Sequence, residues 1–364
     1  MKIGILCYPT YGGSGVVATE LGKELAARGH TVHFISYSIP MRLKFSENIF
    51  FHKVEMSSYP LFDFPLYSIA LASKIVEVAK YHGLDIVHAH YAIPHATSAY
   101  LAKEILLSEM QSGRKNSHSG IKIITTLHGT DITLIGLEIS FLPTMKFSIE
   151  RSDGVTAVST FLKVKTVSQY NINKDIEVIP NFIDLEHYKR IESEESKCLK
   201  QRYAKNGEKL IVHTSNFRPL KRVDDAIRIF NEVRKKIPSK LLLIGDGPER
   251  SNCEYLAKEL GIHDDVIFFG NLEEFVEILS IADLFLMPSQ SESFGLSALE
   301  GMACSLPVVS SNAGGLPELN LHGETGYIAE MGDIIKMAGV HERLRLDGLY
   351  RGIGAGKVRR ADRM

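Results

Sequence analysis

The sequence predicts an α/β protein built from two doubly wound parallel-sheet domains that face a central cleft. Its 364 residues are about twice the usual size of one domain. Short apolar, β-branched runs alternate with longer helical patterns, which is typical of βα units and a mainly parallel sheet. A polar, charged stretch at 192–208 separates two such series. Because ligands of such sheets bind beyond the carboxyl ends of the strands, we expect the site in the cleft.

The first series of units predicts a domain over residues 1–183. Its apolar runs predict strands at Lys2–Cys7, Thr31–Ser36, Asp85–His90, Ile121–His128, Gly154–Val158 and Glu177–Ile179. Between the first two strands, Gly15–Arg28 has the apolar spacing of a helix, and Gly29 follows it as a C-terminal glycine does.

The second series predicts a domain over residues 210–338, after a hinge region at 184–209. Its strands are predicted at Leu210–Thr214, Leu241–Ile244, Val266–Phe269, Leu284–Met287 and Pro307–Ser310. The remaining stretch, 339–364, lacks a sustained amphipathic pattern. We interpret it as an atypical tail, truncated or altered.

Composition excludes several classes of partner. The formal net charge is −1, so no global charge favours nucleic acid or an anionic membrane. The four cysteines are scattered without zinc spacing. No apolar run predicts a membrane span, and the N-terminal run is too short for a secretory signal. We therefore expect a cytoplasmic protein.

Two loops of the first domain carry candidate binding residues. Gly12-Gly13-Ser14-Gly15 follows the first strand and opens a helix, where free amides attract anions; a tight turn without a ligand is the alternative. The segment from Thr126 to Asp131 ends a strand with His128, which is a catalytic candidate or a structural histidine. His88, His90 and His95 cluster around Tyr91, but we expect no metal there.

In the second domain, the loop from Asn216 to Arg222 follows the first strand. Its cations Arg218 and Lys221 suit a pyrophosphate, although a solvated basic loop would show the same pattern. The most informative segment runs from Pro288 to Ala303. There Glu292 precedes a predicted helix and Glu300 lies inside it. The amides of 294–297 would then be free to bind a diphosphate.

The segment around Glu292 and Glu300 resembles the paired-glutamate motif of the retaining GT-B glycosyltransferases, which consist of two Rossmann-like domains. Pro307–Glu318 and His322–Gly326 resemble that family as well. Ile3–Leu21, Asp85–His95 and Thr126–Asp131 resemble the bacillithiol-pathway members of glycosyltransferase family 4. The resemblance covers about residues 1–338.

That resemblance implies transfer of N-acetylglucosamine from UDP-N-acetylglucosamine to the hydroxyl of L-malate, with the α configuration retained. It implies that Glu300 holds the ribose, Glu292 the sugar hydroxyls and Lys221 the diphosphate, with His128 near the reacting centre. The donor-binding candidates are Gly13, Ser14, Asn216, Arg218, Lys221, Glu292, Phe294, Gly295, Leu296 and Glu300. The catalytic candidates are His128, Lys221, Arg218 and Glu292, and the acceptor-binding candidates are Ser14, Tyr91, Thr126 and Arg151. Many relatives have arginine in place of Asn216, and Arg218 is the nearest substitute.

We expect no cofactor and no metal, because no DxD-type motif follows a strand. The partners are then the two small-molecule substrates, and the sequence allows a homo-oligomer. Three alternatives stay open. The first is a retaining enzyme of the same fold with an inositol phosphate, lipid or polysaccharide acceptor. The second is a UDP-sugar 2-epimerase, against which the paired glutamates argue, and the third is a non-catalytic UDP-sugar binding protein.

Overall fold

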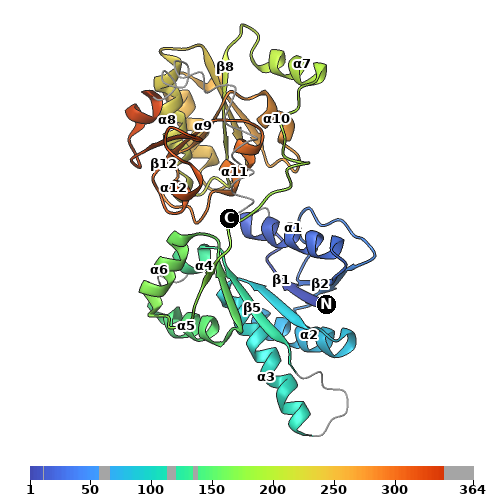
Figure 1. Ribbon diagram of the computed structural model, residues 1–364. Coiled ribbons are helices and arrows are strands. Elements are labelled where there is room, and N and C mark those ends of the chain that lie inside the picture. Colours follow the sequence, from blue (N-terminus) through green and yellow to red (C-terminus); the bar gives the residue numbers. More distant parts are fainter. Residues whose placement is uncertain (11, 57–65, 113–119, 134–137, 340–364) are drawn as a thin grey trace. The chain divides into compact units, whose positions relative to one another are not determined.

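The computed structural model describes residues 1–364 except 11, 57–65, 113–119, 134–137 and 340–364. The chain divides into two units, Met1–Asn181 and Phe182–Met364 (Figure 1). The boundary lies two residues before the predicted one at 183. The tail predicted over 339–364 lies, except for Gly339, outside the described residues.

Seven parallel strands form the sheet of the first unit, in the order β3-β2-β1-β4-β5-β6-β7. The strand order reverses between β1 and β4, so the loops after these two strands leave the sheet on either side of one junction. The strands are β1 (Lys2–Leu6), β2 (Thr31–Ser36), β3 (Ile49–Lys53), β4 (Ile86–His90), β5 (Lys122–Leu127), β6 (Gly154–Ala157) and β7 (Glu177–Val178).

Helices cover both faces of this sheet, because successive side chains of a strand point to opposite faces. Ile5 and Phe34 pack with Ala18 of α1, whereas Leu6 and Ile35 pack with α2 and α3 on the other face. Figure 1 shows α1 on one side of β1 and β2, and α2 with α3 on the other. The helical segments are α1 (Gly13–Ala27), α2 (Tyr67–His82), η1 (Ala92–Ala96), α3 (Thr97–Gln111), α4 (Thr130–Thr133), η3 (Ile139–Phe141), α5 (Leu142–Arg151) and α6 (Thr160–Tyr170).

The second unit repeats this plan with six parallel strands in the order β10-β9-β8-β11-β12-β13. Here the order reverses between β8 and β11. The strands are β8 (Lys209–Thr214), β9 (Ser239–Ile244), β10 (Val266–Gly270), β11 (Leu284–Met287), β12 (Val308–Ser311) and β13 (Gly326–Ala329). The helical segments are α7 (Glu194–Tyr203), η4 (Pro219–Lys221), α8 (Val223–Arg234), α9 (Arg250–Glu259), η5 (His263–Asp265), α10 (Val276–Ile281), α11 (Leu296–Ala303) and α12 (Leu316–Leu319).

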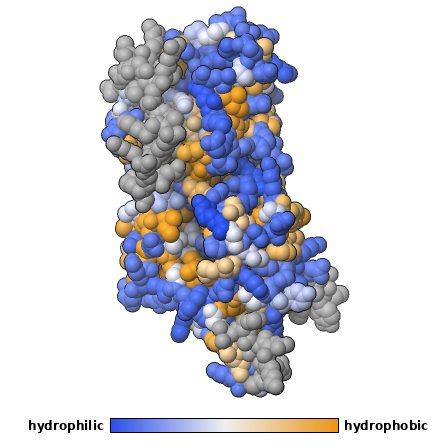
Figure 2. Space-filling model, turned by 45° about the vertical axis from the view of Figure 1, so that its right-hand side comes forward, coloured by the Kyte–Doolittle hydropathy of each residue, from blue (hydrophilic) through white to orange (hydrophobic). Residues whose placement is uncertain are grey.

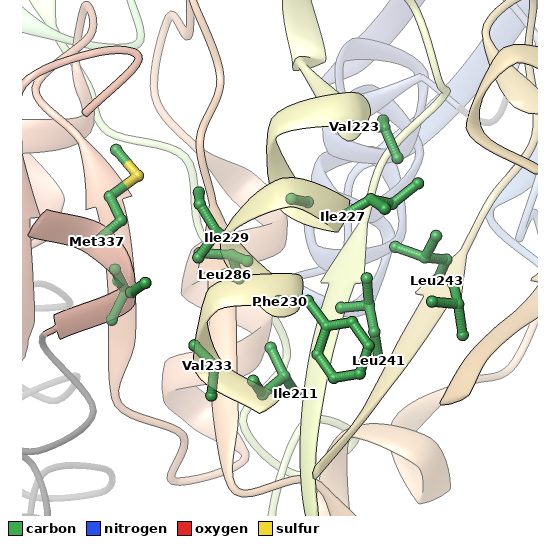
Figure 3. Packing of buried hydrophobic residues seen from close by; sticks show 14 of the residues in the cluster. Ile211, Val223, Ile227, Ile229, Phe230, Val233, Leu241, Leu243, Leu286 and Met337 are labelled. Atoms are coloured by element: carbon green, nitrogen blue, oxygen red, sulfur yellow. The ribbon is translucent and has the colours of Figure 1, made fainter. Parts of the chain in front are cut away.

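The core of the second unit forms where α8 packs on the sheet. The ring of Phe230 is fully buried and lies among Ile211 of β8 and Leu241 of β9 (Figure 3). Burial of such a ring contributes about 2–3 kcal/mol. Val223, the first residue of α8, is buried in the same cluster, and it holds the end of the loop between β8 and α8 against the core.

Most predicted strands are confirmed to within two residues, but β3 and β13 were not predicted. The first residue of β13 is Gly326, where only glycine fits, since a Cβ would lie 1.9 Å from the carbonyl oxygen of Val308. Glycine ordinarily argues against a strand, which is why this strand was not predicted. The predicted helix after β1 begins at Gly13, two residues early. Gly29 has φ +83° and ends that helix as predicted.

The region predicted as a hinge, 184–209, folds largely with the second unit. Helix α7 lies inside it and begins with a capping box between Ser193 and Ser196. Lys200 Nζ of this helix lies 2.9 Å from Asp283 Oδ1, and the Ile191 amide donates to Ser280 Oγ at 3.0 Å. These bonds explain why a polar composition does not mark a free linker here.

Hydrophilic side chains cover most of the face drawn in Figure 2, and hydrophobic ones form separate patches. Among the helices of the described residues, none combines the length and apolar character that crossing a bilayer requires.

Candidate active site

In the first unit, the predicted residues Ser14 and Tyr91 meet at the junction between β1 and β4. Ser14 lies in the first turn of α1 and Tyr91 directly follows β4. Tyr91 Oη donates to Ser14 Oγ at 2.6 Å. The two loops that flank the strand-order reversal are therefore joined by one hydrogen bond, at the place where doubly wound sheets bind ligands.

The turn between β1 and α1 requires its glycines. A Cβ on Gly15 would lie 2.5 Å from the Tyr8 carbonyl oxygen. Helix α1 has no side-chain cap at Gly12, and Gly13 is exposed. The first amides of a helix lack intrahelical partners, so this turn presents hydrogen-bond donors and the positive end of the helix dipole beside Ser14.

His128 lies at the carboxyl end of β5, as the motif predicted, and the structure places it next to Tyr91. Its Nε2 is 2.8 Å from His90 Nδ1, and its ring centroid is 5.5 Å from that of Tyr91. Burial lowers the pKa of His128 to about 3, with a further lowering from His88 and His95. At neutral pH this imidazole is therefore uncharged, and it offers a hydrogen bond rather than a positive charge.

Thr126, predicted to bind the acceptor, is buried one residue before the end of β5. Its Oγ1 lies 2.7 Å from His88 Nε2 and 2.8 Å from Thr156 Oγ1. These two neighbours already bond the hydroxyl. Thr126 therefore helps to hold the His88 ring in position.

Asp131 links the two loops around His128 and Tyr91, and the sequence analysis did not select it. The fully buried carboxylate accepts from the Ala92 amide at 3.1 Å and from the Gly129 amide at 3.0 Å. Burial raises the pKa of Asp131 to about 6, against the opposing effect of these amides. An acidic residue just beyond a strand-end histidine and glycine is the signal that could have identified it.

Arg151 lies at the opposite edge of the sheet from Ser14 and Tyr91. It is the last residue of α5, and β6 begins at Gly154, so Arg151 lies near the amino ends of the strands. Its guanidinium lies over the Phe147 ring, 5.6 Å from the centroid. The structure therefore does not bring Arg151 together with the other acceptor-binding candidates.

In the second unit, Lys221 and Glu292 meet at the junction between β8 and β11. Lys221 comes from the loop after β8 and Glu292 from the loop after β11. Lys221 Nζ is 2.6 Å from Glu292 Oε1, and Ser289 Oγ donates to the same oxygen at 2.9 Å. The Glu292 side chain is 9% exposed. A cation and a carboxylate are thus held together at the second strand-order reversal.

The loop after β8 rests on the loop after β9. A Cβ on Gly245 would lie 1.8 Å from the Ser215 carbonyl oxygen, and one on Gly247 would lie 2.1 Å from that of Asn216. Asn216 and Arg218 themselves are exposed. Gly245 and Gly247 therefore let the loop after β9 contact the backbone of the loop after β8. This contact helps to position the backbone that leads to Lys221.

The remaining donor-binding candidates surround the start of α11. Gly295 has φ +98° and immediately precedes Leu296, the first residue of the helix. Phe294 is buried before it, and the buried Glu300 lies one turn inside. The amides of Ala298 and Leu299 both bond to the Gly295 carbonyl, so the amides ahead of them are the ones without intrahelical partners.

Gly314 supports the Glu292 loop, and we expect Gly314→Ala to disturb it. Gly314 has φ +61°, and its Cβ would lie 1.9 Å from the Glu292 carbonyl oxygen. Backbone strain and overpacking together should lower the free energy of unfolding by about 3 kcal/mol. Gly323→Ala is the matched control because Gly323 also has positive φ, at +78°, with nothing within 4 Å of its Cβ. Equal losses of stability in urea unfolding would contradict the steric explanation.

The two units match two family models. Residues 11–187 match the model described as Glycosyltransferase Family 4, and residues 196–349 match that of the glycosyl transferases group 1. Over 357 residues, the chain is 46% identical to N-acetyl-alpha-D-glucosaminyl L-malate synthase of Bacillus anthracis, covering 97% of this chain and 90% of that protein. The chain belongs to the same glycosyltransferase family as this relative. It is a hexosyltransferase, and the predicted family and GT-B fold are confirmed.

More distant relatives share the fold of the family. The chain is 26% identical over 278 residues to the GDP-mannose-dependent alpha-(1-6)-phosphatidylinositol monomannoside mannosyltransferase of Mycolicibacterium smegmatis, covering 72% of this chain and 68% of that protein. The crystal structure of Anabaena Alr3699/HepE with UDP and glucose superposes with a TM-score of 0.78 at 20% identity, covering 100% of this chain and 95% of that one. The glycosyltransferase from Rickettsia africae gives a TM-score of 0.77 at 21% identity, with coverages of 100% and 92%.

Proposed function

We propose that this enzyme transfers N-acetylglucosamine from UDP-N-acetylglucosamine to the hydroxyl of L-malate with retention of the α configuration, the first step of bacillithiol biosynthesis. The observation that carries the proposal is the 46% identity, over 97% of the chain, to the Bacillus anthracis relative that bears the corresponding name. Two further observations support it. Polar side chains gather at the strand-order reversal of each sheet, and a solved protein of the same fold binds UDP and glucose.

The donor belongs to the second unit in this proposal. Glu300, buried inside α11, would hold the ribose, while Glu292 would hold sugar hydroxyls. Lys221 Nζ, 2.6 Å from Glu292, would bind the diphosphate with help from the exposed Arg218. The amides from Phe294 to Leu296 would complete the anion site at the helix start. Because Lys221 pairs with Glu292 in the structure, its ammonium group would have to be shared between Glu292 and the diphosphate.

The acceptor belongs to the first unit. Malate carries two carboxylates and one hydroxyl, so its site needs hydrogen-bond donors more than apolar surface. The amide of Gly13 and the hydroxyl of Ser14 would supply such donors at one junction, and Tyr91 Oη would orient the Ser14 hydroxyl by donating to it. His128, uncharged at neutral pH, would orient the sugar or the attacking hydroxyl by a hydrogen bond.

The reaction would form the bond between the malate oxygen and C1 of the sugar while the bond from C1 to the diphosphate oxygen breaks. Both events would take place on one face of the sugar, which retains the configuration. The proton of the malate hydroxyl would pass to a phosphate oxygen, and UDP would leave. Lys221 and the helix amides would stabilise the growing negative charge. The step would need no cofactor and no metal.

The test measures UDP release from UDP-N-acetylglucosamine by the full chain, with and without L-malate, in the presence of EDTA. We expect release only with L-malate, and a product of one sugar joined to one malate by an α linkage. Release with D-malate or inositol phosphate but not with L-malate would instead show another acceptor. Binding of UDP without release under any of these conditions would overturn the catalytic proposal.

A further inference from the structure

Three histidines that lie far apart in the sequence meet on one face of the first unit. His33 belongs to β2, His52 to the neighbouring edge strand β3, and His82 is the last residue of α2. Each offers one ligand atom, and these atoms all lie within 4.8 Å of one another. Figure 1 shows α2 beside this part of the sheet.

Packing within the first unit holds these rings close together. The centroid of the His33 ring lies 4.5 Å from that of His82 and 5.2 Å from that of His52, and the His52 and His82 centroids are 5.1 Å apart. His33 is 1% exposed. Because Ile35, two residues further along β2, packs towards α2 and α3, strand alternation places the His33 side chain on that same face.

The polar atoms of this cluster are incompletely bonded. His33 Nδ1 lies 2.9 Å from His52 Nε2. Within the described residues, the buried Nε2 of His33 has no hydrogen-bond partner. An orphaned nitrogen in a buried imidazole is costly, because buried polar groups are normally paired. A ligand bound among the three rings would let them exchange nitrogen–nitrogen contacts for stronger bonds.

Burial favours the uncharged form of His33 and of His52. Burial lowers the pKa of His33 to about 4, and His82, His52 and Lys2 lower it further. The pKa of His52 is also lowered, by burial, His82 and Lys74, against the opposing effect of Glu77. Two of these charged groups have other partners. Lys2 Nζ donates to the His82 carbonyl at 2.7 Å, and Lys74 pairs with Glu77 at 2.7 Å.

We propose that His33, His52 and His82 form a binding site for one Zn²⁺ ion per chain. Three imidazoles suit zinc, copper and nickel, whereas magnesium and calcium prefer oxygen ligands. Nitrogens on one tetrahedral zinc lie about 3.4 Å apart, given bonds of about 2.1 Å. The ligand atoms, which lie within 4.8 Å of one another, would have to settle at about that tetrahedral separation, and water would take the fourth position.

This site joins three separate elements of the first unit. It would tie edge strand β3 to β2 and both strands to the end of α2. Edge strands are the least protected part of a sheet, so the ion would stabilise the fold of the first unit. Because β2 and β3 lie to one side of the junction between β1 and β4, the ion would take no part in sugar transfer. The proposal therefore stands or fails independently of the proposed function.

The experiment uses the full chain after removal of metals with a chelator. Zinc is added against a chromophoric competitor, and Co²⁺ is added in parallel for its visible spectrum. We expect one equivalent of zinc to bind, and the cobalt form to show the strong absorption of four-coordinate Co²⁺. His52→Gln and His82→Gln should each weaken zinc binding by at least about 100-fold and remove that absorption. His263→Gln, an exposed histidine of the second unit, is the matched control and should bind as the natural chain does.

Thermal unfolding separates binding from misfolding. With the chelator present, variants that fold should unfold near the temperature of the natural chain, and added zinc should raise that temperature only for the natural chain and the control. His52→Gln is the safer of the two site variants, because His52 is partly exposed on an edge strand. Failure of the natural chain to bind one equivalent, or equal binding by folded His52→Gln, would overturn the proposal.

Discussion

Replacing Lys221 with alanine is expected to lower kcat/KM for sugar transfer by about 1000-fold, the effect of removing one donor from a preorganised anion site. Lys221 Nζ is 2.6 Å from Glu292 Oε1, and its side chain is 19% exposed. Because the side chain is largely shielded from water, the attraction between its ammonium group and a leaving diphosphate is stronger than it would be in water. The effect should fall on kcat more than on KM, because negative charge grows on the leaving group only as the bond to the sugar breaks.

The measurement is steady-state UDP release by the purified variant, with Lys235→Ala as control. Lys235 is an exposed lysine that pairs with Glu232 in its own helix, so its loss should leave kcat/KM unchanged. Lys221→Arg keeps the charge but not the compact geometry, and we expect it to recover part of the activity. Since Lys221→Ala also leaves Glu292 without its cation, urea unfolding must show that the variant is folded. Transfer within about tenfold of the natural rate in a folded Lys221→Ala would refute the role of this lysine.

The parts of the site that the sequence predicted are those encoded within one loop. The run from Gly12 to Gly15 fixes both the turn and the position of Ser14, and the segment from Glu292 to Glu300 contains its own helix start. In each case the chain following a strand carries the polar groups, so locating the strand also locates the group. The strand order then places the loops beside one another, as the bonds of Ser14 to Tyr91 and of Lys221 to Glu292 show.

What the sequence could not predict depends on contacts between distant segments. His33, His52 and His82 show no metal-ligand spacing, because three separate elements bring them together. Asp131 joins two loops through the amides of Ala92 and Gly129. The sequence around His128 marks an acidic group there, but it does not reveal which distant loop that group contacts. Arg151 is a different case. The strand predicted from Gly154 already implied that a residue just before it lies at the amino edge of the sheet, so this misplacement was avoidable.

We expect the stability of the protein to fall steeply as the pH is lowered from 6.5 to 4. Burial lowers the pKa of His95 to about 4, that of His213 to about 4 and that of His128 to about 3. In the unfolded chain these imidazoles take up protons near pH 6.5. Between that pH and the folded pKa the unfolded state binds more protons, so acid favours unfolding. The buried His95 and His213 each contribute up to about 3 kcal/mol to this loss.

Asp131 acts in the opposite direction but does not reverse the trend. Its pKa is raised from 3.8 to about 6, so the folded state binds more protons between these values, and this carboxyl adds stability as the pH falls. One such group offsets about one histidine. In the first unit Asp131 therefore offsets about one of the two histidines His95 and His128, and in the second unit the loss from His213 is not offset by it. A loss of about 3 kcal/mol in each unit is a large share of the 5–15 kcal/mol that usually hold a domain folded.

The measurement is urea unfolding at pH 7, 6 and 5 with EDTA present, following each unit by a probe of its own. His213 lies in the second unit, where its Nδ1 is 2.9 Å from the Leu286 carbonyl oxygen. His213→Gln removes one titrating group, so the loss of unfolding free energy of that unit between pH 7 and 5 should shrink by about 2 kcal/mol. His263→Gln, which alters an exposed histidine of the same unit, should leave this loss of unfolding free energy unchanged. If both variants lose the same unfolding free energy between pH 7 and 5, proton uptake by His213 does not drive acid unfolding. The carboxylates that are paired in the folded state would then be the cause.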